Sequence, residues 1–384
     1  MNKKTKVIST FLIYIVMMIV ATTEGLINMF GVSIRESFNI SDTTFSLMFT
    51  FGSIGYLLCN YIGGYLSEKI GQKKLVLIGL IGVILMNLVQ WKAPSFLIFG
   101  ISFAFIQGFL GLISIAINTV IPILWLTGQA IAMNLTHFSY GVGLSASQKI
   151  SGMLLNDNVS WRYIYFGAAI LTLIIFIVFF FVKLPYNKEV NKIEKVSLSE
   201  VLKEKTTWFL VIGLGFYIMA EQGTGRWLPT YIETNYGYLN KSQIASYISI
   251  FFLLLTLGRL VGGFIVQKFG DLKSVKFFSF LGALTFISGL LLGEKGLYMI
   301  SFSGFFFSII FPTSVVIASN SFKKYKAYST GVVITFASIV NTFLNLLVGV
   351  LSDKFGISIA IFVMPISIFI TFCFISMINR FKKS

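Results

Sequence analysis

Two glutamates, Glu24 and Glu221, lie deep inside long apolar runs of the sequence. The second belongs to the stretch IMAEQGTGRWLPTYI, residues 218–232, where a guanidinium group follows the carboxylate closely. An ionised side chain at the centre of a bilayer costs about 3 kcal/mol, so such residues face a cavity or a partner. A carboxyl group in a cavity can accept a proton and later release it. We therefore predict that both glutamates carry protons or bind a solute; the alternative is a structural ion pair or hydrogen bond.

Arg226 lies five positions after Glu221, about 140° further around an ideal helix. A direct ion pair between the two side chains therefore requires a break in the helix. Two glycines between them permit a break, and Pro229 removes a further backbone donor. We expect a discontinuous helix here, with Arg226 near a central cavity. The alternative is that Arg226 snorkels to the membrane surface, where Trp227 serves as an interfacial anchor.

Three other ionisable side chains fall inside or beside apolar runs. Lys149 is a candidate counter-charge for Glu24, although it lies late in its run and can also snorkel outward. Arg259 occupies a glycine-rich stretch, so we expect it to hold a gate or a helix interface. His137 is the single histidine of the chain and is expected to pack or to form hydrogen bonds, with pH sensing as the alternative.

Neutral amides inside apolar helices are candidates for contacting a solute, because Asn and Gln offer both donors and acceptors to a ligand rich in hydroxyl groups. The alternative is hydrogen bonding between helices. Arg226 and Trp227 complete the predicted solute-binding set. The amides are Asn28, Gln107, Asn118, Gln222, Asn341 and Asn345.

The composition is that of an integral membrane protein. Of 384 residues, 56% are hydrophobic and 11% are charged, with a mean hydropathy of +0.87. A soluble domain carries about 25% charged residues. The two cysteines, Cys59 and Cys373, lie in apolar runs, which argues against a disulfide framework. We expect no metal and no cofactor.

Apolar segments of membrane-spanning length predict an all-α membrane protein with about twelve transmembrane helices in two pseudo-symmetric six-helix bundles. The N-terminal run resembles a signal peptide, but its length and the absence of a cleavage signal favour a span. A polar linker, residues 184–205, separates predicted bundles at 1–183 and 206–384. The expected spans are 7–30, 44–66, 74–91, 96–124, 130–155, 161–182, 206–231, 243–266, 274–292, 296–318, 327–350 and 357–379.

The basic residues gather on one side of the predicted membrane topology. With the N-terminus placed in the cytoplasm, inside segments hold 21 of the Lys and Arg residues and outside loops hold 6. This bias predicts a multi-pass protein of the cytoplasmic (inner) membrane with both termini inside. It also explains the net charge of +16 without a nucleic-acid partner.

The two halves share a repeated pattern. GYLSEKIG at 64–71 matches GFIVQKFG at 263–270, and Glu24 occupies the position in the first span that Glu221 occupies in the seventh. Parallel repeats of this kind are a transporter architecture. We expect a solute to bind between the halves near the middle of the membrane, with both glutamates facing it.

The turn GGYLSEKIGQKK, residues 63–74, combines glycines with charges that can form a gating cluster. VGVLSDKFG, at 348–356, carries a similar pattern on the other side of the membrane. These motifs resemble the signature loop of the major facilitator superfamily, which usually has Asp where this chain has Glu68. The resemblance implies secondary transport. The predicted gating residues are Glu68, Lys69, Lys73, Lys74, Arg259 and Asp353.

Four further stretches resemble the fucose and glucose–proton symporter branch of that superfamily, which implies sugar uptake driven by protons. The fourth span, 96–124, departs from this branch, because it lacks the acidic residue often found there. The four stretches are AMNLTHFSYGVG at 132–143, EQGTGRWLPTY at 221–231, LTLGRLVGG at 255–263 and IIFPT at 309–313.

The leading hypothesis is a monomeric secondary transporter that moves a small polar solute, best guessed as a sugar or related metabolite, together with protons. The alternative on the same fold is an exporter of drug-like or amphipathic compounds. An enzyme is not expected, because no loop holds a catalytic constellation. The chain also lacks the motif G-x-x-x-x-G-K-[ST], which argues against direct ATP coupling.

The predicted topology places Lys73 and Lys74 in the cytoplasm. Cysteines introduced there, in a background without Cys59 and Cys373, should react with a membrane-impermeant thiol reagent only after the cells are opened. Labelling of these cysteines from outside intact cells would overturn the topology.

Overall fold

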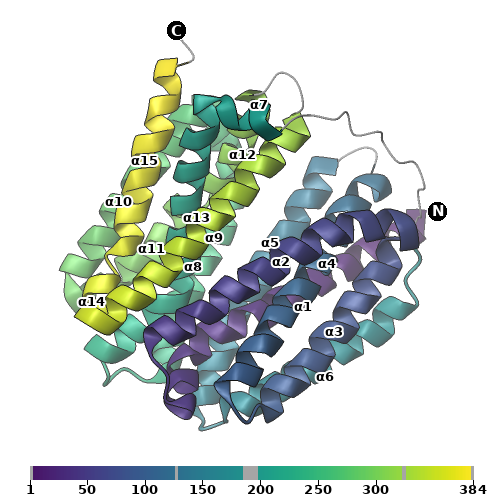
Figure 1. Cartoon of the computed structure of the whole chain (residues 1–384), viewed down its shortest axis with the longest axis horizontal. Coiled ribbons are helices and arrows are strands. Elements are labelled where there is room, and N and C mark those ends of the chain that lie inside the picture. The colour runs from purple at the N-terminus through teal and green to yellow at the C-terminus, as the bar shows by residue number, and fades with distance from the viewer. Residues whose placement is uncertain (1–2, 126–128, 185–197, 322–325, 382–384) are drawn as a thin grey trace. The chain divides into compact units, whose positions relative to one another are not determined.

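The structure is a computed structural model that describes residues 3–125, 129–184, 198–321 and 326–381. Within these ranges the chain is helical and contains no strand, which confirms the all-α prediction (Figure 1). Two compact units divide it: the first comprises Met1–Ile40 and Leu47–Asn191, and the second comprises Ser41–Ser46 and Lys192–Ser384.

The first unit contains six long helices. The residues 41–46 at the start of α2 are grouped with the second unit. The six helices are α1 (Lys3–Phe38), α2 (Asp42–Ile70), α3 (Gln72–Lys92), α4 (Phe96–Leu124), α5 (Gln129–Asn156) and α6 (Trp161–Phe180).

The second unit begins with the short helix α7 (Leu198–Lys203), inside the predicted linker; residues 185–197 of that linker lie outside the described ranges. Its tenth and twelfth predicted spans are each built from two consecutive α-helices. The helices that follow α7 are α8 (Lys205–Asn235), α9 (Lys241–Phe269), α10 (Asp271–Leu291), α11 (Leu297–Phe307), α12 (Ile310–Ser321), α13 (Lys326–Phe355), α14 (Ile357–Ala360) and α15 (Val363–Phe381).

Ten helical stretches among the described residues are long and apolar enough to cross a membrane. The helices α5 and α8 are not among them, although both have spanning length. Both carry several polar side chains, and α8 holds Glu221, Gln222 and Arg226 in succession. The two least apolar long helices are therefore also those with many of the predicted functional residues, as expected for helices that line a polar path.

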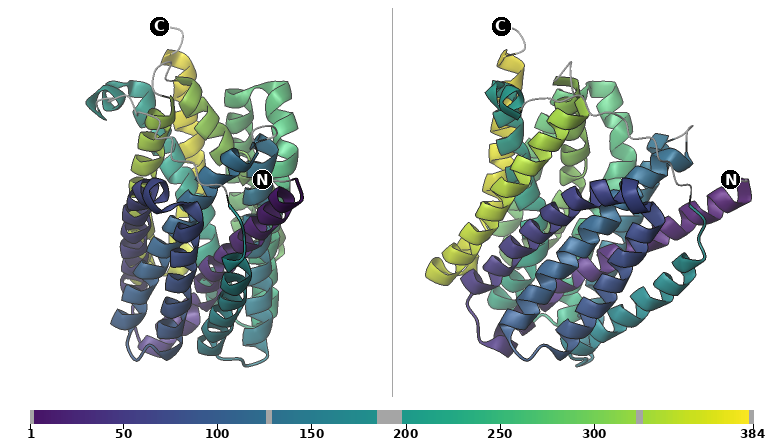
Figure 2. Two further views of the ribbon diagram at one scale, coloured as in Figure 1. Left: turned by 90° about the vertical axis from the view of Figure 1, so that its right-hand side faces the viewer. Right: turned by 45° about the vertical axis from the view of Figure 1, so that its right-hand side comes forward.

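In the first unit α1 packs along α5, and α3 packs between α4 and α6. Buried aliphatic side chains from α1, α3 and α4, such as Ile13, Leu80 and Ile117, form its core. In the second unit α8 packs against α13 and α15, while α11 packs against α9 and α10 (Figure 2). Each unit therefore buries the polar helix α5 or α8 against neighbouring helices of the same unit.

The sequence repeat corresponds to a repeated backbone turn. Gly71 before α3 has φ 89° and ψ 149°, and Gly270 before α10 has φ 84° and ψ 153°. Both helices that follow are 21 residues long. A positive φ of this size is accessible to glycine at little cost, which explains why both copies of the motif end in Gly.

Glycine also allows the close approach of α1 and α5. A Cβ atom at Gly143 of α5 would overlap the backbone of Met18. A Cβ atom at Gly25 of α1 would lie within 2.9 Å of Ser147 and Gln148. These two helices therefore touch through their backbones, and this contact fixes where α5 presents its polar side chains to α1.

We predict that Gly143→Ala destabilises the protein by about 1–3 kcal/mol, because the added methyl group overpacks the α1–α5 contact. The matched control is Gly167→Ala on α6, where a Cβ atom meets nothing within 4 Å. Thermal unfolding in detergent should show a lower midpoint for the first variant and no decrease for the second. Equal midpoints would contradict the close packing of α1 on α5.

Candidate functional site

Glu221, near the middle of α8, has protein partners for both carboxylate oxygens. Its Oε1 lies 3.2 Å from Nη2 of Arg259 on α9, which forms an ion pair. Its Oε2 accepts a hydrogen bond from the hydroxyl of Tyr217, one turn earlier on α8. The Glu221 and Arg259 side chains keep 20% and 26% of their exposure, so this pair is not sealed inside the protein.

The glycine-rich stretch of α9 places Arg259 beside Glu221. A Cβ atom at Gly258 would crowd Ser308, and one at Gly262 would overlap Ile309, so α9 approaches the α11–α12 junction closely on both sides of Arg259. Small residues four apart permit such contacts between membrane helices. We predicted Arg259 as a gating residue; the structure shows it as the cationic partner of Glu221.

The prediction of a discontinuous helix at residues 221–229 was wrong. Helix α8 runs without interruption from Lys205 to Asn235, with Pro229 inside it. The break was inferred so that Arg226 could reach Glu221, but Arg259 of another helix fills that role. Because Gly225 lies four residues before Pro229, no side chain crowds the carbonyl that the proline ring approaches.

Arg226 instead joins a network of amides between α8 and α13. Its Nη2 donates to Oε1 of Gln222, at 3.0 Å, and the same oxygen accepts from Nδ2 of Asn341, at 3.2 Å. Nε1 of Trp227 donates to Oδ1 of Asn345, at 3.4 Å. Because 222 and 226, like 341 and 345, are four apart on their helices, each pair shares a face. Five of the predicted solute-binding residues therefore lie together in the second unit.

Glu24 in the first unit accepts a hydrogen bond at 2.6 Å from the hydroxyl of Tyr140 on α5. The α1–α5 contact positions this tyrosine, since Ser147 donates to the carbonyl of Thr22 and Gln148 donates to that of Gly25, both at 3.0 Å. Each unit therefore holds one glutamate of its first long helix by a tyrosine hydroxyl. The tyrosine comes from α5 in the first unit and from the same helix in the second.

Sequence reasoning missed both tyrosines. Tyr217 lies four residues before Glu221, a spacing that places two side chains on one helix face, so a local signal existed. Tyr140 is separated from Glu24 by 116 positions, and nothing local indicates the pairing.

The remaining neutral candidates lie in the first unit. Asn28 is buried on α1, one turn after Glu24, and Gln107 is half-buried on α4 beside Gly52 of α2. Nδ2 of Asn118 lies 3.4 Å from the hydroxyl of Ser114, which also lies 3.3 Å from that of Tyr56 on α2. This chain links α4 to α2, so the structure shows a hydrogen-bonding role between helices for Asn118.

The predicted gating lysines lie against aromatic rings at the α2–α3 turn. Nζ of Lys69 is 6.0 Å from the ring centre of Tyr65, and Nζ of Lys73 is 5.7 Å from that of Phe180. Lys74 is exposed. The side chain of Glu68 lies outside the described part of the structure.

Asp353, at the end of α13, caps the first turn of α2. Its two carboxylate oxygens accept from the backbone N–H groups of Asp42 and Thr43, both at 2.8 Å. Ser352 donates to the Asp42 carboxylate. A carboxylate at a helix N-terminus satisfies free donors and the helix dipole, so Asp353 has a defined holding role within the second unit.

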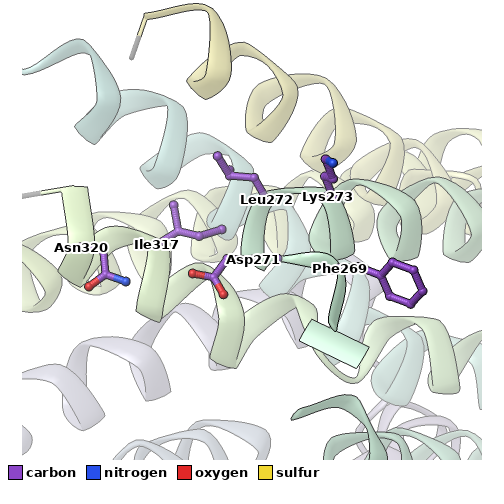
Figure 3. A pocket seen from close by; sticks show the side chains of 7 residues that line it. Phe269, Asp271, Leu272, Lys273, Ile317 and Asn320 are labelled. Carbon is purple, nitrogen blue, oxygen red and sulfur yellow. The ribbon is translucent and has the colours of Figure 1, made fainter. Parts of the chain in front are cut away.

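His137 is exposed on α5, and Lys149 is half-buried further along the same helix. A surface pocket of about 370 Å³ lies in the second unit where the α9–α10 junction meets α12 (Figure 3). Asp271 and Lys273 contribute to it from α10 and Asn320 from α12. None of the predicted site residues lines this pocket. The candidate site is therefore the set of buried polar contacts around the two glutamates.

The sequence profile described as Major Facilitator Superfamily matches residues 10–333 of this chain. A "Protein TsgA homolog" of Buchnera aphidicola subsp. Baizongia pistaciae is 25% identical, over 95% of this chain and 94% of that protein. The "Cis,cis-muconate transport protein" of Acinetobacter baylyi is 22% identical, over 76% of this chain and 74% of that protein.

A "Glucose/galactose transporter" of Brucella abortus biovar 1 is 24% identical, over 88% of this chain and 85% of that protein. Among solved structures, the E. coli fucose:proton symporter superposes with a TM-score of 0.66 at 17% identity, over 97% of this chain and 99% of that one. This structural likeness shows the fold.

We predict that Glu221 and Arg259 are energetically coupled. In a double-mutant cycle with Glu221→Gln and Arg259→Gln, thermal stability should reveal a coupling of about 1–3 kcal/mol, because each single variant leaves a polar group without its partner inside the membrane. The matched control is the Glu233–Lys241 pair at the ends of α8 and α9, for which we expect about 0–1 kcal/mol. Strict additivity at the Glu221–Arg259 pair would contradict the interaction.

Proposed function

Since the chain belongs to the Major Facilitator Superfamily, we propose that it is a secondary transporter that moves a small polar solute, a sugar or related metabolite, together with protons by alternating access. The observation that carries this proposal is Glu221, a carboxylate inside a spanning helix with a tyrosine and an arginine on its two oxygens. Such an acid can take up a proton when its ion pair opens and release it when the pair reforms.

The proposed solute contacts are polar. In the second unit they are Gln222, Arg226, Trp227, Asn341 and Asn345, which already form hydrogen bonds with one another. In the first unit we propose Asn28, Gln107 and Asn118. A network of amides suits a hydroxyl-rich solute and disfavours an amphipathic drug, because an apolar ligand would leave these buried groups without partners.

Several relatives support the choice of solute and driving force. One relative is described as a glucose/galactose transporter, and one protein of the same fold is a fucose:proton symporter. We propose that the protein functions as a monomer in the cytoplasmic membrane, with both termini inside. We also propose repeats at 1–183 and 206–384 joined by the linker 184–205, with Glu24 as a second proton-carrying residue and the residues of the two turn motifs as gates.

We predict that Glu221→Gln abolishes uphill solute accumulation driven by a pH gradient in proteoliposomes, because an amide cannot bind and release the coupled proton. Downhill exchange of labelled solute should persist. The matched control is Glu200→Gln, an exposed acid on α7. Accumulation by Glu221→Gln at the wild-type level would exclude this glutamate from coupling.

A further inference from the structure

The interiors of the spanning helices contain more cations than acids. Glu24 and Glu221 are the acids, whereas Lys149, Arg226 and Arg259 are the cations. One positive charge is therefore in excess even when both acids are ionised. A net charge at this depth is costly unless the molecule uses it, and such residues mark solute or ion pathways.

Arg226 lies deep enough for this cost to apply. It is on a helix of 31 residues, Lys205–Asn235, about 9 Å from the helix midpoint at a rise of about 1.5 Å per residue. The hydrocarbon core extends about 15 Å on either side of the bilayer centre. Arg259 is matched to the carboxylate of Glu221, whereas the contact that orients Arg226 is the neutral amide of Gln222.

The amides beside Arg226 have hydrogen-bonding capacity to spare. Asn345 is 1% exposed and its Nδ2 has no hydrogen-bond partner among the described residues. Asn341 is 4% exposed and its Oδ1 likewise has none. A buried donor and a buried acceptor therefore lie on the α13 face that contacts α8, one turn apart. Such groups are costly to leave unsatisfied, so a ligand that pairs with them gains affinity.

We infer that the transported solute carries a carboxylate, that the guanidinium of Arg226 binds this carboxylate, and that Asn341 and Asn345 bind neighbouring hydroxyl groups. The inference rests on the proposed transport function and narrows its solute class from neutral sugars to hydroxylated organic acids. Arg suits this role because its planar fork of donors matches a carboxylate in a two-point contact.

An anionic solute also gives the charge balance a simple form. One solute anion and one proton enter together, so the coupled step moves no net charge. Uptake of the acid should therefore follow the pH gradient and be insensitive to an imposed membrane potential. A neutral sugar moved with one proton would instead carry one positive charge and respond to the potential.

Pairs of probes that differ only in the acid group test the inference. Galacturonate is compared with galactose, and glucuronate with glucose, at equal ionic strength because salt screens charge interactions. Binding is measured as the rise in the unfolding midpoint of the detergent-purified protein, and uptake is measured in proteoliposomes with a pH gradient. We expect an apparent affinity for at least one acid about 10- to 100-fold above that for its neutral partner.

Variants of Arg226 assign the preference to this side chain. Arg226→Gln should reduce the preference for the acid to less than about threefold, and Arg226→Lys should restore part of it, since it keeps the charge but lacks the fork. The matched control Lys354→Gln removes an exposed positive charge near the end of α13 and should leave the preference unchanged. A reading of Arg226 as purely structural predicts lower stability without a change in preference.

The outcomes separate the two proposals. Neutral sugars that bind and accumulate as well as the acids, or a preference that survives Arg226→Gln, would overturn the inference and leave proton-coupled transport standing. Binding of an acid through Arg226 without uptake would support the inference and count against transport. If no acid stabilises the wild-type protein above its neutral partner, the inference is wrong.

Discussion

A carboxylate inside a membrane-spanning helix must find its partners within the protein, and this constraint organises the second unit. Glu221 meets it with Arg259 on one oxygen and Tyr217 on the other. The ion pair requires α9 to present Arg259 at one position, and the glycines that flank Arg259 let α9 pack closely enough to do so. The conserved geometry of a helix turn places Tyr217 on the same face as Glu221. One buried charge thus explains a tyrosine, an arginine and two glycines.

The two repeats meet the same constraint in different ways. Both place a glutamate at the same position of the first long helix and hold it with a tyrosine hydroxyl. In the first unit that tyrosine comes from α5 and depends on the backbone contact between α1 and α5. In the second unit it comes from α8 itself, which leaves α13 available for the amides around Arg226. The second unit can therefore separate an acid–base face from a polar binding face of one helix.

Much of the fold was predictable from the sequence, because long apolar runs and a glycine turn are local signals. The expected spans correspond to observed helices, and the turn repeat reappears in the φ angles of Gly71 and Gly270. The candidate site was predictable as a set of residues but not as a set of contacts. The pairing of Arg259 with Glu221 depends on the register between two helices, which no single sequence displays. Tyr140 was hidden among sixteen tyrosines for the same reason.

Infrared difference spectroscopy of the protein reconstituted in lipid tests the central claim most directly, because it detects the protonated carboxyl group itself. The account predicts a carboxylic-acid C=O band that grows as the pH is lowered and that is diminished in Glu221→Gln. A spectrum that does not change with pH, or a pH-dependent band that is identical in wild type and variant, would show that Glu221 is a fixed structural anion rather than the proton carrier.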